Sequence, residues 1–381
     1  AAKKCTPNLD LLAERGMQIL NLHSAPSCAP ARAMLVTGCY PQRFGIYRNG
    51  DVYKEGLPDE AYSLVKVLQQ NGYHTGLVGK WHLGQRLEAE DGPRKELGFA
   101  EGKHPLDQGF DYFFGIDRAQ TSYYDSRHLW RNRQFGVSAK GYLTDQLTEQ
   151  ALGFLDRSSR KSQPFFLYLS YTAPHVPVDP PPYKYVEPFD IGHERMDNIY
   201  GMIYAMDAGV GRVIDYLKQN NLEKNTLVIF ASDNGAPGWY PIPSNAPLRG
   251  YKRQFFEGGM RVPSIIYWPG KVSQGTECNE MLSFMDLMPT ILDACGYSIP
   301  KSLTIDGHSF LPVLSKKAKV SGDRQLFWAG PNGRYSMQLK DYKKIEKKKN
   351  TSPWDILPFG WYVRQGKWKL VDPSDGKLLL Y

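Results

Sequence analysis

The sequence predicts an α/β fold in which helices sandwich a mainly parallel sheet. Two observations support this prediction. Helical and strand-like segments alternate along most of the 381 residues, which is the pattern of βαβ units. In addition, polar side chains follow several of the strand-like segments directly. Ligands bind at the carboxyl ends of strands in such sheets, so the alternation also predicts where a site lies.

The beginning of the chain shows the alternation clearly. Residues 6–16 are expected to form a helix, because proline suits its first turn and glycine ends it. An apolar strand over 17–22 follows, and residues 27–38 are expected to form a second helix with the same proline and glycine signals. Cys28 therefore falls at a strand-to-helix turn.

The same order recurs further along the chain. A helix over 59–71 precedes a strand over 73–78, a second strand covers 164–171, and a helix over 196–219 precedes a strand over 226–231. Each strand leads into polar residues, so we expect one shared site that contains Lys80, His82, His175, Asp233 and Asn234 together with Cys28.

The end of the chain has a different pattern. Alternation weakens beyond residue 314, and four short segments are typical of antiparallel strands, namely 325–328, 361–364, 368–371 and 377–381. We therefore predict a catalytic α/β domain over 1–314 and a small antiparallel α+β subdomain over 315–381.

Composition narrows the function only in part. The net charge of +8 favours an acidic partner, either a sulfated glycan, a nucleic acid or an anionic membrane surface. The lysine-rich stretch 340–349 is interpreted as a solvated loop. No run of about 18 apolar residues occurs, so no membrane span is expected, and the first residues lack the apolar stretch of a signal peptide. The five cysteines show no CxxC spacing, which argues against structural zinc or a thioredoxin-type site.

Residues 28–32 read C-A-P-A-R, and L-V-T-G-C-Y-P follows at 35–41. This stretch resembles the signature of the type I sulfatases, formylglycine-dependent enzymes of the alkaline-phosphatase superfamily that include arylsulfatases and N-acetylgalactosamine-6-sulfatases. The resemblance implies an alkaline-phosphatase-like fold and oxidation of Cys28 to formylglycine by a formylglycine-generating enzyme. It also implies that one hydroxyl of the hydrated aldehyde attacks sulfur and that the other later expels sulfate.

The position of Cys28 suits an anion on physical grounds as well. The amides of the first helical turn point toward a ligand there, and the helix dipole adds a favourable potential. Arg32, one turn into the helix, can reach back to the nucleophile. The alternative is that Cys28 is a small buried residue beside a capping Ser27.

Residues 72–84 read G-Y-H-T-G-L-V-G-K-W-H-L-G, which is similar to the second sulfatase signature. The resemblance implies that Lys80 holds a sulfate oxygen. It further implies that His82 contacts the formylglycine hydroxyl and acts as the base that eliminates sulfate. A histidine whose pKa is near neutrality suits that role.

Two further stretches resemble sulfatase motifs. The sequence P-H-V-P at 174–177 implies that His175 binds sulfate and protonates the leaving oxygen, whereas the alternative is a histidine that stabilises a turn. The sequence G-Y-K-R-Q-F-F-E-G-G-M-R-V-P at 250–263 places Lys252 at a sulfate-binding position, in preference to Arg253. Glu257 and Arg261 are expected to be structural.

Residues 232–235 read S-D-N-G and resemble the metal loop of the same family. The resemblance implies that Asp233, Asn234 and the modified Cys28 bind Ca²⁺, and oxygen ligands also admit Mg²⁺. The alternative is an ordinary Asp-Asn-Gly turn.

One element of the resemblance is missing. Type I sulfatases begin with a central strand that ends in paired aspartates, and no Asp-Asp occurs before Thr6. Without those carboxylates Ca²⁺ lacks the six to eight oxygens it prefers. We therefore expect the sequence to be a fragment that lacks this first strand and is truncated at both ends. The alternative is a degenerate homologue without activity.

The leading hypothesis is a sulfuric ester hydrolase that acts on a sulfated carbohydrate or related ester. The residues expected around the sulfate are Cys28, Arg32, Lys80, His82, His175 and Lys252. Aromatic and basic residues between 110 and 135 are candidates for a sugar cleft, although packing is the favoured interpretation. A phosphoester or phosphonate hydrolase and a non-catalytic polyanion-binding protein are the rival hypotheses. The resemblance favours a periplasmic, secreted or lysosomal protein and no nucleic acid partner.

Overall fold

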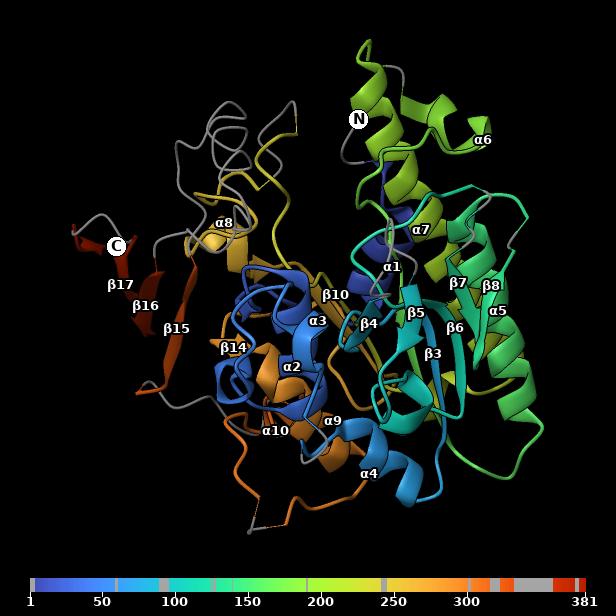
Figure 1. The fold of residues 1–381 in the computed structure, drawn as a ribbon, viewed down its shortest axis with the longest axis horizontal. Coiled ribbons are helices and arrows are strands. Elements are labelled where there is room, and N and C mark those ends of the chain that lie inside the picture. The colour runs from blue at the N-terminus through green and yellow to red at the C-terminus, as the bar shows by residue number, and fades with distance from the viewer. Residues whose placement is uncertain are drawn as a thin grey trace.

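The computed structural model describes residues 4–58, 61–88, 96–124, 126, 128–138, 140–189, 191–240, 245–300, 303–315, 323–331, 359–373 and 377–381. Two sheets with helices around them form most of the molecule, and the strands of the C-terminal sheet lie at one end (Figure 1). The predicted α/β class with a C-terminal antiparallel sheet is confirmed. Within the described residues no helix is long and apolar enough to span a bilayer.

The first sheet has five strands in the order β8-β7-β6-β3-β9. Its centre is β3 (His74–Lys80), which pairs in parallel with β6 (Tyr112–Ile116) and β9 (Phe165–Ser170). Every residue of β3 after His74 is buried, as is typical of a parallel strand covered on both faces. The antiparallel strands β7 (Leu129–Arg131) and β8 (Gln134–Val137) complete the sheet.

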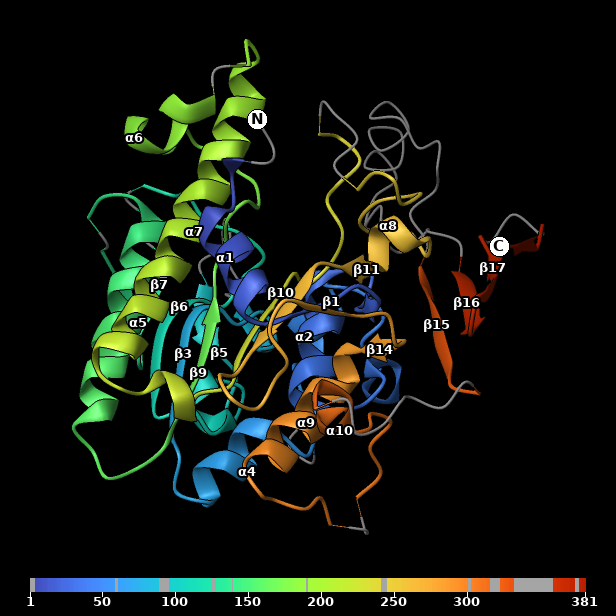
Figure 2. The ribbon, with the colours of Figure 1, turned by 180° about the vertical axis from the view of Figure 1, so that it is seen from behind.

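Helices cover both faces of this sheet. The long helices α5 (Leu143–Ser159) and α7 (Glu194–Gln219) pack against each other on the outer side (Figures 1 and 2). On the inner side lies α2 (Cys28–Thr37), whose Ala29, Ala33 and Val36 share a core with residues of β3 and β6. The opposite side of α2 packs into the core beneath the second sheet. This helix is therefore buried nearly all round, which fixes the position of its first residue.

The second sheet has the order β10-β12-β1-β13 and is mixed. Its strands are β1 (Met17–Ile19), β10 (Val228–Ala231), β12 (Ser264–Tyr267) and β13 (Thr276–Cys278). Only the β1–β13 pair is parallel. The single strand predicted over 17–22 is wrong, because the chain bends after β1 and β2 (Leu22–His23) joins a separate sheet with β11 (Arg261–Val262) and β14 (Leu282–Ser283).

The facing edges of the two sheets are strands that have a hydrogen-bonded neighbour strand on one side only. Within the described part of the chain, β9 and β10 are the edge strands of their sheets. A cavity of about 1840 Å³ is lined by residues of both strands. Apart from Ser170, the residues of β9 and β10 are only half-buried, in contrast to those of β3. The interior of the molecule is therefore not completely filled between the two sheets.

Other predicted elements are confirmed with adjusted bounds. The helix over 6–16 is α1 (Pro7–Arg15), and Gly16 follows it. The helix expected over 59–71 is shorter in the described residues: α4 (Leu64–Gln70) begins after Ser63, whose hydroxyl accepts from the amide of Val65. Lys80 is the last residue of β3 rather than part of the loop beyond it.

The C-terminal sheet is wholly antiparallel. It contains β15 (Gln325–Pro331), β16 (Phe359–Gln365), β17 (Trp368–Asp372) and β18 (Leu379–Leu380). Its buried side chains belong to the same apolar cluster as Met17 and Phe255, so this sheet packs directly on the rest of the molecule. The lysine-rich stretch 340–349 lies outside the described residues.

Short elements complete the described fold. They are α3 (Val52–Glu55), β4 (Arg86–Glu88), β5 (Glu96–Phe99), α6 (Tyr183–Val186), α8 (Glu257–Met260), α9 (Leu287–Ala294) and α10 (Leu311–Leu314). The five cysteines, all of which lie in the described residues, form no disulfide.

Candidate active site

Cys28 is the first residue of α2, at the strand-to-helix turn that the sequence predicts. Its side chain is buried, with 1% of the residue exposed. The thiol sulfur lies 3.3 Å from Nζ of Lys252, and the side chain of His175 also hydrogen-bonds to it. The amide of Ala29 donates to Oδ1 of Asn49 at 3.0 Å, so Asn49 fixes the start of the helix. No sequence signal pointed to Asn49.

The thiol stands in a strongly cationic pocket. Burial alone raises the pKa of Cys28, but Lys252, Lys80 and His175 together bring it well below its ordinary value. Burial lowers the pKa of Lys80 to about 8, and the nearby thiolate opposes that shift. Lys252, Lys80 and His175 thus stabilise the negative charge of the Cys28 thiolate. The pocket is built to hold an anion.

Arg32 connects the ends of three strands. Its guanidinium donates to the carbonyl of Lys80 and to the hydroxyl of Ser170, both at 2.6 Å, and to Oδ2 of Asp233 at 3.0 Å. The residue is 4% exposed, so these contacts satisfy a charge that water cannot reach. The hydrogen bonds of Arg32 therefore run to strand ends and to Asp233, whereas the sequence suggested a reach back to the nucleophile.

His82 lies in the turn just beyond β3. It is fully buried and adopts a left-handed backbone conformation with φ of 63°. Its Nε2 is 2.7 Å from the phenol oxygen of Tyr53 in α3, a partner that no sequence motif indicated. The contact of His82 with the nucleophile stays a prediction.

The loop after β9 presents His175. The ring nitrogen Nδ1 is 2.9 Å from the carbonyl of Val176, so Nδ1 carries hydrogen and the other nitrogen is left for the Cys28 side. The backbone of His175 is held by Thr172 and by the hydroxyl of Tyr123 at 3.1 Å. Tyr123 is thus a loop anchor.

Two aromatic residues of the segment 110–135 pack in the interior rather than lining a sugar cleft. Tyr123 and Trp130 are both buried, and Trp130 stacks among Phe99, His104 and Phe135. The packing interpretation of these residues, favoured from sequence, is therefore the one that the structure supports.

Asp233 and Asn234 follow β10 and lie beside Arg32. The carbonyl of Asp233 accepts from the hydroxyl of Ser24 at 2.6 Å. Oδ1 of Asn234 is buried and has no hydrogen-bond partner among the described residues, which is the condition expected of a metal ligand. These donors suit Ca²⁺ or Mg²⁺ in type. The number of ligands is too small for either cation. The described part of the chain contains no group of three or more His, Cys, Asp or Glu that could hold a metal.

The segment around Lys252 is held by backbone contacts. The amide of Lys252 donates to the carbonyl of Ala236 at 3.0 Å, and that of Arg253 donates to Pro26 at 2.7 Å. The loop after β10 and the turn that precedes Cys28 therefore both touch this segment. The side chain of Lys252 reaches the thiol, as the preferred alignment of the motif predicts.

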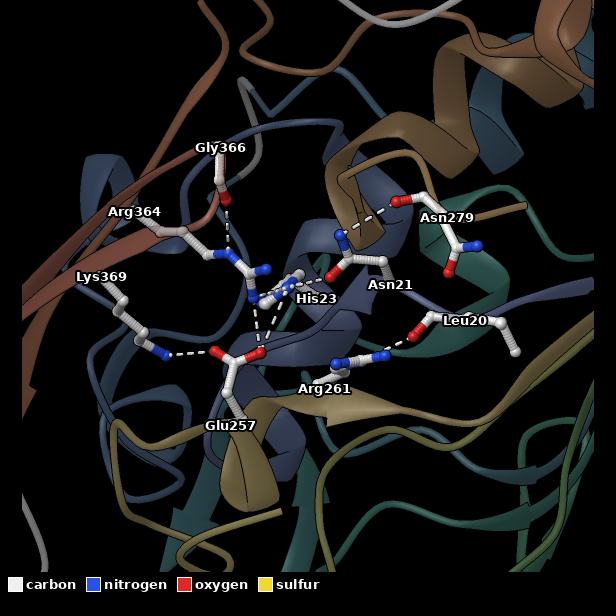
Figure 3. A network of polar contacts seen from close by, with 9 residues as sticks. All are labelled: Leu20, Asn21, His23, Glu257, Arg261, Asn279, Arg364, Gly366 and Lys369. Atoms are coloured by element: carbon white, nitrogen blue, oxygen red, sulfur yellow. Dashed lines mark hydrogen bonds and ion pairs between the residues drawn. The ribbon is translucent and has the colours of Figure 1, made fainter. Parts of the chain in front are cut away.

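A polar network lies behind this segment (Figure 3). Glu257, the first residue of α8, is 2.9 Å from Nζ of Lys369 in β17 and also pairs with Arg364 in β16. Nε2 of His23 is 3.8 Å from the same carboxylate. Arg261 donates to the carbonyl of Leu20 at 2.6 Å. Both residues expected to be structural, Glu257 and Arg261, thus tie elements together.

The charges of this network are set by burial and by the cations. Burial on its own raises the pKa of Glu257, yet His23 in its protonated form, Lys369 and Arg364 lower it to about 2. Burial lowers the pKa of His23 to about 3, so the ring is neutral near neutral pH. The C-terminal sheet is therefore joined electrostatically to the segment that carries Lys252.

Together, the fold and the site define an α/β protein with a buried anion pocket around a nucleophilic side chain at a helix start. Comparison with known proteins identifies the family. The Sulfatase family matches residues 2–297, and the family described as N-sulphoglucosamine sulphohydrolase, C-terminal, matches residues 250–372. The chain belongs to the sulfatase family, whose members are sulfuric ester hydrolases.

Individual relatives agree with this assignment. The chain is 41% identical to an uncharacterized sulfatase of Escherichia coli K12, YdeN, over 97% of this chain and 70% of that protein. It is 33% identical to N-acetylgalactosamine-6-sulfatase of Mus musculus, over 89% of this chain and 66% of that protein. The crystal structure of Ps i-CgsB in complex with k-i-k-neocarrahexaose superposes with a TM-score of 0.84 and 28% identity, over 99% of this chain and 80% of that one.

Proposed function

We propose that the protein hydrolyses sulfate esters of a sulfated carbohydrate, with a nucleophile made by oxidising Cys28 to formylglycine. The observation that carries this proposal is the buried pocket in which Lys252, Lys80 and His175 lower the pKa of Cys28. A sulfate group brings the same negative charge to the same donors. The names of the N-acetylgalactosamine-6-sulfatase relative and of the neocarrahexaose complex support a sugar as the alcohol part.

The residues around Cys28 have separate roles in the proposed reaction. Formylglycine, when formed, supplies a geminal diol in place of the thiol. Lys80 and Lys252 neutralise sulfate oxygens in a site from which water is largely excluded, where charge pairs are strong. Nδ1 of His175 donates to the carbonyl of Val176, so when the ring is doubly protonated the hydrogen on its other nitrogen is the one given to the leaving oxygen. Arg32 keeps the strand ends that carry these groups in register.

The cation is a separate part of the proposal. Asp233 and the unpartnered Oδ1 of Asn234 offer oxygen ligands, but Arg32 already pairs with one carboxylate oxygen. We propose that further ligands come from a strand seated between β9 and β10, where the cavity is open. Such a strand would bring its carboxyl end beside Asp233.

The test is to express the protein together with a formylglycine-generating enzyme and to analyse the peptide that contains Cys28 by mass spectrometry. The proposal expects loss of the thiol sulfur and turnover of aryl sulfate, N-acetylgalactosamine 6-sulfate or sulfated neocarrahexaose. A thiol that persists under these conditions contradicts the formylglycine nucleophile.

The same preparation separates the rival functions. A clear preference for aryl phosphate over aryl sulfate would favour the phosphoester hydrolase instead. Unmodified Cys28 combined with glycan binding that falls steeply with salt would favour a polyanion-binding protein.

A further inference from the structure

Trp239 is an exposed aromatic residue beside the proposed sulfate pocket. It is 49% exposed and lines the same cavity as His175 and Lys252. Single exposed apolar residues are common on protein surfaces, so exposure by itself indicates nothing. The position of Trp239, five residues after Asn234 and in this cavity, is what distinguishes it from the exposed Trp361 and Trp368 of the C-terminal sheet.

The backbone on both sides of Trp239 is fixed. The hydroxyl of Tyr240 donates to the carbonyl of Pro174, next to His175, at 2.8 Å. Burial raises the pKa of Tyr240 to about 12, so this donor keeps its proton. Gly238 packs against the ring of Tyr251, where an added Cβ would come within 2.8 Å. The two neighbours of Trp239 thus anchor this segment near His175, while Trp239 itself stays half exposed.

We propose that Trp239 is a stacking platform for the sugar ring that carries the sulfate, an inference that rests on the proposed hydrolysis of sulfated carbohydrate. With the sulfate between Lys80 and Lys252, the leaving oxygen lies at His175. The rest of the alcohol must then extend toward the loops that follow β9 and β10, at the end of the cavity where Trp239 is exposed. A pyranose ring has an apolar face of C–H groups, which packs well on the face of an exposed indole.

The kinetic test uses Trp239→Ala, the conservative Trp239→Phe and the matched control Trp368→Ala, which is 56% exposed and away from the cavity. For whichever sulfated sugar is hydrolysed, KM is expected to rise about 10-fold in Trp239→Ala and about 3-fold or less in Trp239→Phe. Trp368→Ala should leave KM unchanged. The inhibition constant of inorganic sulfate, which fills only the anion pocket, should change in none of the three.

A binding test makes the inference independent of turnover. Calorimetry with the Cys28→Ala protein measures Kd for N-acetylgalactosamine 6-sulfate, for neocarrahexaose and for inorganic sulfate. Adding Trp239→Ala should weaken sugar binding about 10-fold and leave sulfate binding unchanged.

Each result decides the inference. The platform would be overturned if Trp239→Ala left the Kd for the sugars unchanged or weakened inorganic sulfate binding equally. It would also be overturned if neither sugar bound. If the sugars bind through Trp239 and no sulfate ester is hydrolysed, the proposed function fails and the platform stands.

Discussion

At the scale of single residues, the anion pocket is the central feature. Cys28 is a weak acid in water, and its burial should make it weaker still. Two lysines and a histidine reverse that effect, because their charges and hydrogen bonds act at short range in a dry site. The same arrangement can be examined in the unmodified protein through the thiol and in the matured protein through sulfate.

Removing one lysine should return the thiol toward ordinary behaviour. In unmodified protein, Lys252→Met is expected to raise the pKa of Cys28, because the nearest positive charge is lost. The pH dependence of alkylation by a small reagent, followed peptide by peptide, measures this change. Cys295, whose pKa burial raises, serves as the internal reference. An alkylation profile of Cys28 that does not move in Lys252→Met contradicts the prediction.

Lys80 should set the alkaline limit of activity. Its pKa of about 8 means that its charge is lost as the pH rises through that value, so kcat/KM should fall there. The Cys28 thiolate raises this pKa, and its removal on maturation shifts the limit to lower pH. Lys80→Arg keeps its charge and should extend activity to higher pH. Identical alkaline limbs for the two proteins would assign the limit to another group.

At the scale of elements, the polar network of Figure 3 joins α8 to β16 and β17. Glu257→Gln leaves two buried cations without their counterion and is expected to cost about 3 kcal/mol of unfolding free energy. The matched control is Glu149→Gln, which breaks the exposed pair with Arg212 and should cost under about 0.5 kcal/mol. Urea unfolding at pH 7 compares the two, and equal losses would contradict a buried network.

The same network should make the protein acid-sensitive. The folded pKa of Glu257, about 2, is below its ordinary 4.5, so its stabilising effect is complete above pH 4.5 and is lost as the pH falls toward 2. His23 acts in the same direction, because the unfolded chain takes up its proton below pH 6.5 while the folded ring stays neutral to about 3. In Glu257→Gln the loss of stability between pH 5 and 3 should be shallower than in the wild type.

Many of the helices and strands, and much of the site, could be predicted from local sequence patterns. Proline and glycine mark the ends of α1 and α2, and polar motifs follow β9 and β10. The predictions that fail depend on distant partners. The strand over 17–22 splits because β1 and β2 find different neighbours, and the contacts of Asn49 and Tyr53 join residues that no local motif relates. Period and composition carry no information about such contacts.

At the scale of the whole molecule, the open space between β9 and β10 separates the two sheets. Thr6, just before α1, lines the same cavity, so an extension preceding it could reach the space. Adding an apolar strand that ends in Asp-Asp is expected to raise Tm, because it buries half-exposed residues of both edges. Ca²⁺ should then raise Tm further.

The control for this experiment is the same extension ending in Asn-Asn. It should keep the gain in Tm that comes from strand pairing and lose most of the gain from Ca²⁺, since the added carboxylates are gone. If neither extension changes Tm, the space does not accept a strand, and the proposed source of the missing cation ligands is wrong.

The two open strands also have a consequence for how copies of the chain meet. An unpaired strand exposes a row of amide and carbonyl groups that can template pairing with another molecule. Here two such rows, β9 and β10, border one cavity. At high concentration the described chain should therefore self-associate by intermolecular β-pairing, and light scattering should rise steeply with concentration.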